Sequence, residues 1–151
     1  MADAKPIEYL ASAEAMARGA YFLADGPLDS ALSCSLLVAQ SLECVLKCYL
    51  LYRDAPERDL KNPPFGHDLD ALWIQAHSKG LDISANPSRW CVMLNTAYNK
   101  PYYLRYPVGI NGIISPERKP MVDDLVRIIL MVREIAYPGS SGLPYIASEW
   151  E

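Results

Sequence analysis

The sequence lacks most of the short motifs that carry recognisable chemistry. It contains four cysteines and two histidines, and no two cysteines have CxxC spacing, which argues against a zinc ribbon or a dithiol redox motif. Its eight glycines form neither the Walker nor the dinucleotide-binding pattern. No serine or cysteine lies in a nucleophile-elbow or catalytic-dyad context. The sequence therefore offers no motif for an enzyme class, a zinc ribbon or a nucleotide cofactor.

The chain also has little positive charge overall. Its net charge is −4, which argues against a general polyanion binder because nonspecific nucleic-acid affinity comes mostly from neutralised phosphates. The charge is unevenly spread, however, since residues 87–119 contain five basic residues and one acid. That local excess suits a small anionic ligand or a short nucleic-acid strand. A chance cluster on a solvated loop is the alternative interpretation.

The four cysteines lie inside apolar helical patterns rather than in turns. We expect them to be reduced thiols that pack as small hydrophobic side chains, although Cys44 and Cys48 share a helix face and are spaced for a metal together with a histidine. Reduced thiols and the lack of a signal-peptide pattern predict a cytoplasmic protein. The cysteines are Cys34, Cys44, Cys48 and Cys91.

One stretch, residues 31–51, is apolar enough to raise the question of a membrane span. It contains Gln40, Glu43 and Lys47 near its middle, and a charged residue at the centre of a bilayer costs about 2.5–3.5 kcal/mol on insertion scales. We therefore predict a buried helix and no membrane association.

Helical periodicity predicts an all-α protein with five helices. A length of 151 residues fits one domain, because most domains have about 100–200 residues. The expected helices span 6–25, 27–52, 67–80, 87–99 and 120–137, with a loop at 53–66. The second is apolar almost all round and should lie at the bundle centre or in a dimer interface. The predicted buried face of the first consists of Ile7, Leu10, Ala11, Ala17, Tyr21 and Leu23.

Residues 100–119 form a long segment that is rich in tyrosine, proline and glycine. Loops of this length are uncommon in compact domains and are often functional. Its Asn111-Gly112 pair is typical of a hairpin turn, so 108–114 could fold as a small hairpin. The tail at 140–151 has no strong pattern and is expected at most to dock loosely.

Three fragments, in this order, resemble the HEPN family of helical domains. The first is residues 37–50, LVAQSLECVLKCYL, and the second is residues 66–72, GHDLDAL. The third is residues 103–107, YLRYP, in the long segment. The resemblance covers roughly residues 31–107. It implies an up-and-down helical bundle that dimerises and a place among ribonuclease toxins, partners of nucleotidyltransferases, or non-catalytic nucleotide- and RNA-binding domains.

The chain departs from the catalytic pattern of the family's ribonucleases. In that branch, four to six residues separate a catalytic arginine from the histidine that follows it. The two histidines here are His67 and His77, and the arginines upstream, Arg53 and Arg58, are too far away. We therefore expect no ribonuclease activity of the usual kind.

A polar set on the family-like fragments is the expected ligand site. An arginine in the long segment would grip phosphate through its rigid donor fork, and a lysine would add a point charge. A histidine would exchange a proton or donate to phosphate, and tyrosines would stack on a base. The set consists of Gln40, Glu43, Lys47, His67, Tyr102, Arg105 and Tyr106.

The sequence thus predicts a non-catalytic, homodimeric binding module for a nucleotide or short RNA, with a nucleotidyltransferase as a candidate partner. One alternative is a structural dimerisation module, in which the same polar residues form a satisfied internal network. Another is an unconventional endoribonuclease that uses His67 and Arg105.

Overall fold

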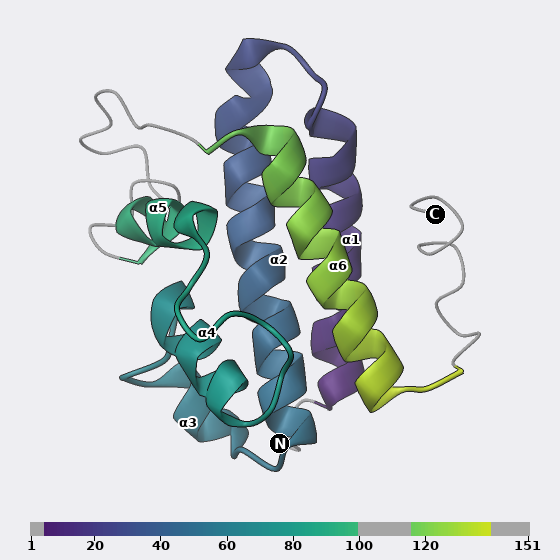
Figure 1. Cartoon of the computed structure of the whole chain (residues 1–151), viewed down its shortest axis with the longest axis vertical. Helices are drawn as coiled ribbons and strands as arrows, with labels where there is room; N and C mark the ends of the chain where they lie inside the picture. Colours follow the sequence, from purple (N-terminus) through teal and green to yellow (C-terminus); the bar gives the residue numbers. More distant parts are fainter. Residues whose placement is uncertain (1–4, 100–115, 140–151) are drawn as a thin grey trace.

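The computed structural model describes residues 5–99 and 116–139, and these residues form helices joined by turns, with no strand among them. The all-α prediction is confirmed. Figure 1 shows the arrangement. In chain order the elements are α1 (Pro6–Leu23), a 3₁₀ turn η1 (Leu28–Ser30), α2 (Ala31–Tyr52), α3 (Glu57–Lys61), α4 (Leu69–Ser78), α5 (Arg89–Tyr98) and α6 (Arg118–Ala136).

Helix α1 packs along α2 through small side chains. The residues it buries are Leu10, Ala13, Glu14, Ala17 and Ala20, and small residues let two helix backbones come close. A methyl group added at Gly19 would lie 3.1 Å from the Leu37 side chain. Two of the residues predicted on this buried face are exposed instead, Ala11 and Tyr21, because the face is rotated toward position 14.

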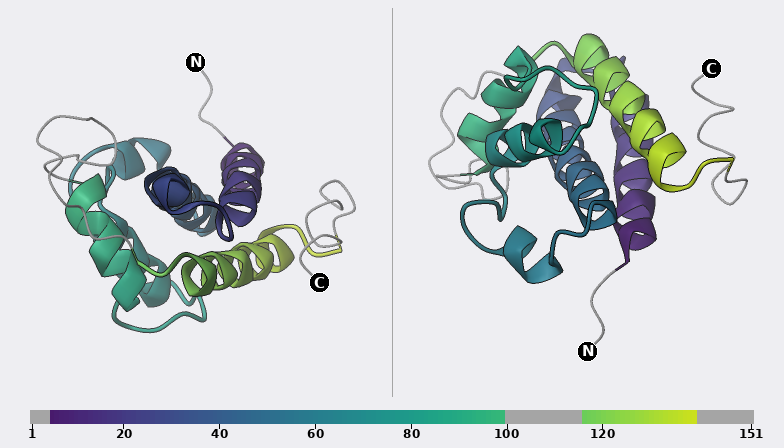
Figure 2. Two further views of the ribbon diagram at one scale, coloured as in Figure 1. Left: turned by 90° about the horizontal axis from the view of Figure 1, so that it is seen from above. Right: turned by 60° about the horizontal axis from the view of Figure 1, so that its bottom comes forward.

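Helix α2 lies at the centre of the bundle, as its all-round apolar sequence predicted. It contacts α1, α4, α5 and α6, and the view from above in Figure 2 shows these helices surrounding it. Helix α6 runs in the same direction as α2 and lies over both α1 and α2, while α1 runs in the opposite direction. Three helices therefore form the main layer of the core.

The short helices α3, α4 and α5 carry the chain from the end of α2 back to the start of α6 (Figure 1). The predicted up-and-down order holds, with a third leg built from short pieces. Helix α3 lies inside the segment 53–66 that was predicted as a loop, so that prediction was wrong. Gly80 ends α4 as predicted, with φ +101°, a conformation that glycine adopts without steric cost.

Four predicted helix starts differ from the structure. Helix α2 begins at Ala31 after the turn η1, not at 27, and α4 begins at Leu69, not at 67. Helix α5 begins at Arg89 after Ser88, not at 87. Helix α6 begins at Arg118, two residues before the expected start at Pro120. Proline is tolerated in this first turn because its missing N–H would have no partner within the helix. The hairpin expected at 108–114 and the tail at 140–151 lie outside the described residues.

Arg118 joins the start of α6 to the turn between α1 and α2. Its Nη1 donates to the carbonyl oxygens of Leu23 at 2.7 Å and Pro27 at 3.2 Å, and to Ser30 Oγ at 3.0 Å. Its Nη2 donates to the Gly26 carbonyl oxygen at 2.9 Å. The guanidinium thus satisfies carbonyl groups at the C-terminal end of α1, where cations are electrostatically favoured.

The segment Leu28–Tyr52 is long and apolar enough to cross a membrane by length and composition alone. In the structure, 72% of its most apolar 18-residue window is buried inside the bundle. A core helix of a soluble protein passes the same test, so this segment gives no argument for a membrane span.

Candidate functional site

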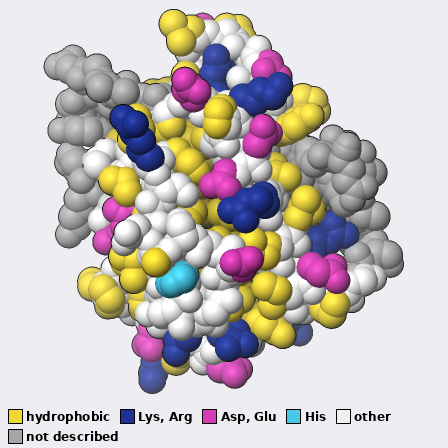
Figure 3. All heavy atoms as spheres, in the orientation of Figure 1, with side chains coloured by type: hydrophobic (Ala, Val, Ile, Leu, Met, Phe, Trp, Pro, Cys, Tyr) yellow, Lys and Arg dark blue, Asp and Glu magenta, His cyan; other side chains and the backbone are white. Residues whose placement is uncertain are grey.

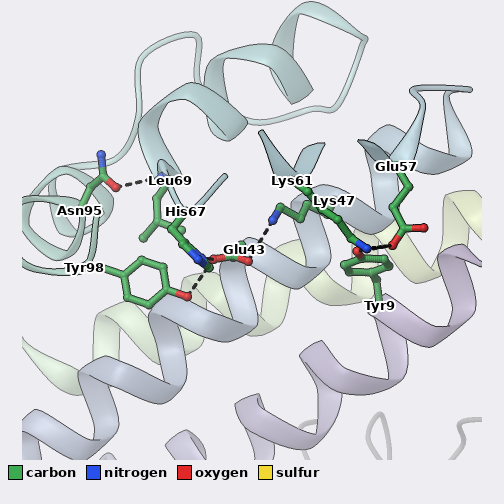
Figure 4. Close-up of polar contacts among 9 residues, drawn as sticks. All are labelled: Tyr9, Glu43, Lys47, Glu57, Lys61, His67, Leu69, Asn95 and Tyr98. Atoms are coloured by element: carbon green, nitrogen blue, oxygen red, sulfur yellow. Dashed lines mark hydrogen bonds and ion pairs between the residues drawn. The ribbon is translucent and has the colours of Figure 1, made fainter. Parts of the chain in front are cut away.

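The clearest polar cluster of the described residues centres on Glu43, in the middle of α2. Its Oε1 accepts a hydrogen bond from the Tyr98 hydroxyl at 2.8 Å and lies 2.8 Å from His67 Nδ1. Its Oε2 accepts from Lys47 Nζ at 3.0 Å. In Figure 4 all three side chains point toward the Glu43 carboxylate. We call these four residues the Glu43 cluster.

The local sequence explains why the cluster assembles. Lys47 follows Glu43 by one helical turn, the spacing at which a glutamate and a lysine pair on a helix. Tyr98 is the last residue of α5, and His67 lies two residues before α4 begins. Hydrogen bonds with the Asn95 side chain in α5 hold the start of α4 against α5.

Asn95 fastens the start of α4 to α5. Its side-chain amide donates to Asp68 Oδ1 at 2.9 Å, and its side-chain oxygen accepts from the Leu69 backbone N–H at 2.8 Å. Asp68 is the N-cap of α4 and accepts from the Ala71 N–H at 3.1 Å. These bonds fix the segment next to His67, so the imidazole is held against α2 and the ring of Tyr98. The two rings meet edge to face, with centroids 5.9 Å apart.

The cluster is internally neutralised. Burial raises the pKa of the Glu43 carboxyl, but the Lys47 charge and the hydrogen bonds from His67, Tyr98 and Lys47 outweigh burial, so the pKa lies below its ordinary value. Glu43 is therefore ionised at neutral pH. The Lys47 side chain is 6% exposed, so its ammonium group pairs with Glu43 inside the protein.

His67 is the accessible member of the cluster, with 46% of its side chain exposed. An ionised carboxylate only accepts hydrogen bonds, so the short contact to Glu43 places a proton on Nδ1. In neutral His67 this leaves Nε2 as the unprotonated ring nitrogen. A carboxylate that holds the inner nitrogen fixes both the tautomer and the ring orientation. The arrangement therefore presents an oriented imidazole at the protein surface.

The structure brings together three of the seven predicted site residues, Glu43, Lys47 and His67. Gln40 lies one turn before Glu43 and is half-buried, but no hydrogen bond joins it to the cluster within the described part of the chain. The remaining three, Tyr102, Arg105 and Tyr106, lie outside the described residues. Sequence reasoning missed Tyr98, the last residue of α5. The available signal was that Tyr98 follows Leu94 by one turn on the buried face of α5.

A second polar group lies beside the cluster along α2 (Figure 4). The Tyr9 hydroxyl donates to Glu57 Oε1 at 3.1 Å, and Lys61 Nζ lies 3.0 Å from the same oxygen. Burial, with Glu57 nearby, raises the pKa of Tyr9 to about 12. Because Tyr9 belongs to α1 and Glu57 to α3, this group fastens the short helix to the bundle.

Glu14 is a buried carboxyl of a different kind. It is wholly buried, and neither carboxyl oxygen has a hydrogen-bond partner within residues 5–99 and 116–139. Burial raises its pKa to about 7, and the Arg133 charge on α6 opposes this only in part. Burial and the Glu14 charge also raise the pKa of Cys48 on α2 to about 12. Glu14 is therefore a buried carboxyl without a hydrogen-bond partner among the described residues.

The face of the molecule shown in Figure 3 carries acidic and basic side chains interspersed among apolar ones. It has no broad patch of one sign, which agrees with the net charge of −4. An extended nucleic-acid surface is therefore not indicated on this face.

Comparison with protein-family models, curated proteins and solved structures finds no match to this chain. The HEPN resemblance therefore stays a prediction that rests on three sequence fragments.

Proposed function

We propose that this protein is a non-catalytic helical module that binds the phosphate of a nucleotide or short RNA beside His67. The observation that carries the proposal is the short contact between Glu43 and His67, which orients a half-exposed imidazole. An imidazole fixed at its inner nitrogen by a carboxylate offers its outer nitrogen to a ligand without further ordering cost. Such preorganisation distinguishes a binding residue from a freely rotating surface histidine.

The charge of the Glu43 cluster sets the kind of ligand. With His67 neutral, the charges of Glu43 and Lys47 cancel and the cluster has no net charge. With His67 protonated the cluster is singly positive, and Nε2 becomes a charge-assisted donor to an anion. Lys47 is too buried to contact a ligand, so its role is to keep Glu43 ionised. This changes the role expected from the sequence, in which Lys47 was a phosphate contact.

The segment after Asn99 supports the proposal by its composition. It carries Arg105, whose guanidinium suits bidentate phosphate binding, and Tyr102 and Tyr106, which suit stacking on a base. The segment begins at residue 100, two positions after Tyr98, and Tyr98 is a member of the Glu43 cluster. A homodimer and a nucleotidyltransferase partner belong to the proposal through the family resemblance alone.

The test is a thermal-shift titration with mononucleotides and a short single-stranded RNA at low salt. A ligand at about a hundred times its dissociation constant adds about 2.7 kcal/mol to stability. We expect a shift that is lost in His67→Ala and in Arg105→Ala. The matched control is His77→Ala, which removes the other histidine, an exposed residue in the last turn of α4.

A shift that survives in His67→Ala would contradict the proposal, as would the absence of any shift in the wild type. Incubation with the same RNA followed by gel analysis tests for cleavage. Cleavage lost in His67→Ala would replace the binding module with the endoribonuclease alternative.

A structural interaction module is the second candidate, and one observation favours it. Glu43 accepts bonds from three side chains and Lys47 is almost fully buried, so the cluster is satisfied without a ligand. A satisfied buried network specifies a unique packing on its own. In that case the cluster variants lower the melting temperature and no nucleotide raises it.

A further inference from the structure

A cavity of about 430 Å³ lies between the first turns of α5 and α6. Its apolar lining includes Trp90, Met93 and Met121, and two charged residues, Arg89 and Glu117, border it. The volume falls within the range of about 300–1,000 Å³ typical of small-molecule sites, which are apolar clefts with a few polar groups. No residue of the Glu43 cluster lines this cavity, so it is a separate site.

Trp90 forms a fixed aromatic wall. Its indole Nε1 donates to Asp124 Oδ2 at 2.9 Å, and Asp124 is held in turn by Arg127, whose Nε and Nη2 lie 3.1 and 2.9 Å from the other carboxylate oxygen. The ring also packs edge to face on Trp73, with centroids 6.0 Å apart. Trp73 is buried. The hydrogen bond to Asp124 and the contact with Trp73 fix the orientation of the Trp90 ring before a ligand binds. Less conformational entropy is therefore lost on binding.

The lining favours a flat aromatic guest. Met93 is half-buried and places its thioether at the cavity, whereas Met121 is fully buried beneath the lining. Sulfur makes favourable contacts with the edges of aromatic rings. The indole offers a face or an edge to a second ring, and bases stack on aromatic side chains in single-strand binding proteins. The size and lining therefore suit one ring system beside Trp90.

The two charged residues narrow the class of guest further. Arg89 and Glu117 are exposed, and neither side chain has a hydrogen bond or ion pair to another of the residues that the structure describes. Arg89 presents only donors and Glu117 only acceptors. A purely apolar guest would leave both unused, and a polyphosphate would meet the negative charge of Glu117. A heterocycle that carries both acceptors and donors on its edge uses both.

We propose that this cavity binds a nucleobase, with the ring beside Trp90 and its polar edge toward Arg89 and Glu117. The inference rests on the proposed function in taking the base from a nucleotide or RNA, and it adds a second contact to the phosphate contact at His67. Helix α5 connects the two sites, since Arg89 and Trp90 begin it and Tyr98 ends it.

The experiment is a tryptophan-fluorescence titration of the full chain with the four ribonucleosides, which carry no phosphate. We expect a purine or pyrimidine nucleoside to change the emission, and Trp90→Phe to reduce that change. Loss of one polar contact should weaken binding about fivefold, so Arg89→Ala and Glu117→Gln should each raise the dissociation constant by that factor. Both residues are exposed, which makes these variants safe for folding.

Lys119→Ala is the matched control. It removes the same charge from an exposed position in the first turn of α6, but Lys119 is not among the residues that line the cavity. Its dissociation constant for the nucleoside should equal that of the wild type. Cyclohexanol serves as an apolar probe without the polar edge and should bind more weakly than the nucleoside.

Several outcomes would overturn the inference. These are no emission change with any nucleoside at millimolar concentration, equal weakening in Arg89→Ala and Lys119→Ala, or cyclohexanol binding as tightly as the nucleoside. The proposed function can fail separately. Nucleoside binding that depends on Arg89, together with a nucleotide shift that survives in His67→Ala, would keep the base pocket and remove the phosphate site.

A short RNA in the same titration identifies the source of the base. If the RNA binds more tightly than the nucleoside and remains sensitive to Arg89→Ala, the base belongs to a strand. Equal affinity for the two makes a free nucleoside or nucleotide the ligand. Both outcomes support a nucleobase in the cavity.

Discussion

Glu14 and Glu43 belong to the two helices that pack most closely in this bundle, yet their carboxyl groups have opposite surroundings. Glu14 in α1 is wholly buried without a hydrogen-bond partner. Glu43 in α2 accepts bonds from Lys47, His67 and Tyr98. Burial dominates at Glu14 and raises its pKa to about 7, whereas the partners dominate at Glu43 and lower its pKa.

The comparison shows that the partners of a carboxyl, more than its depth, decide whether it carries a charge inside this bundle. Glu43 is ionised and organises a polar site at the junction of α2, α4 and α5. Glu14 in α1 lacks such partners among the described residues, and burial raises its pKa to about 7. We expect the Glu43 carboxylate to stabilise the folded protein and the Glu14 carboxyl to destabilise it, and substitutions can test each expectation.

The largest effect is expected from Glu43→Ala. This change leaves the Lys47 ammonium buried without its partner, and breaking a buried ion pair costs about 3–5 kcal/mol. Urea denaturation at pH 7 measures the loss. Adding Lys47→Met removes the orphaned charge and should restore at least half of it. A loss below about 1 kcal/mol for Glu43→Ala would mean that water or another group replaces the carboxylate.

The Glu43 effect should also depend on pH in a defined direction. Because the folded-state pKa lies below the unfolded value, the stabilisation is present above the unfolded pKa and is lost as pH falls through the folded pKa. The difference between wild type and Glu43→Ala should therefore shrink below about pH 4, the usual range of a free carboxyl.

The second largest effect should have the opposite sign. Glu14→Met fills a similar volume without a carboxyl, so we expect it to stabilise the protein at pH 8. The folded-state pKa of about 7 is raised from an ordinary value of 4.5. The stability of the wild type is thus fully present below the unfolded pKa and is lost as pH rises through the folded pKa. At about 1.4 kcal/mol per pKa unit, the variant should gain at most about 3 kcal/mol.

The measurement for Glu14→Met is urea denaturation at pH 4.5 and at pH 8. The advantage of the variant should be small at the lower pH and fully developed at the higher one. An advantage independent of pH would show that packing rather than ionisation is responsible. A destabilised variant at pH 8 would mean that attraction to Arg133 outweighs burial, which contradicts the comparison.

A smaller effect is expected from Tyr98→Phe. This change removes one hydrogen bond to Glu43 and keeps the ring that packs on His67. The expected loss is about 1.5 kcal/mol, the lower end of the range for a hydrogen bond to a charged group, because two other donors to Glu43 remain. Urea denaturation measures it in parallel with Glu43→Ala/Tyr98→Phe. In the absence of the carboxylate, Tyr98→Phe should cost little. An equal cost in both backgrounds would show that the hydroxyl acts elsewhere.

The smallest effect should come from His67→Ala. Its side chain is 46% exposed, and ion pairs at exposed positions contribute about 0–1 kcal/mol. We expect the free energy of unfolding to fall by less than about 1 kcal/mol. A loss above about 2 kcal/mol would make His67 a structural residue of the cluster and would weaken its use as a binding residue.

Much of the fold could be predicted from periodicity. Helix α4 falls within the helix predicted at 67–80, because a ten-residue helix with one apolar face gives a clear signal; its buried residues are Leu69, Leu72, Trp73 and Ala76. Helix α3 could not be found in this way. It spans only five residues between prolines, so it has no repeat, and it is held by the bond from Tyr9 to Glu57.

The site was less predictable, for two physical reasons. The pairing of Glu43 with Lys47 follows from helical spacing, but the approach of His67 depends on Asn95, which is distant in sequence. Such side-chain bonds between helix ends leave no periodic signal. Glu14 was missed because acidic residues are assumed to face solvent, although it follows Leu10 by four positions and precedes Ala17 by three, on the same face of α1.

The bond set of Arg118 has a consequence for the order in which a growing chain can fold. The turn after α1 receives its capping donors from a residue about ninety positions later, as the four Arg118 bonds show. During synthesis, at about 5–20 residues per second, α1 and α2 would emerge seconds before α6. Until then the apolar side chains of α1 and α2 that pack against α6 are exposed, and the carbonyl groups of the turn after α1 hydrogen-bond to water. The paired helices would therefore be most exposed to aggregation or chaperone capture in that interval, which the arrival of Arg118 and α6 brings to an end.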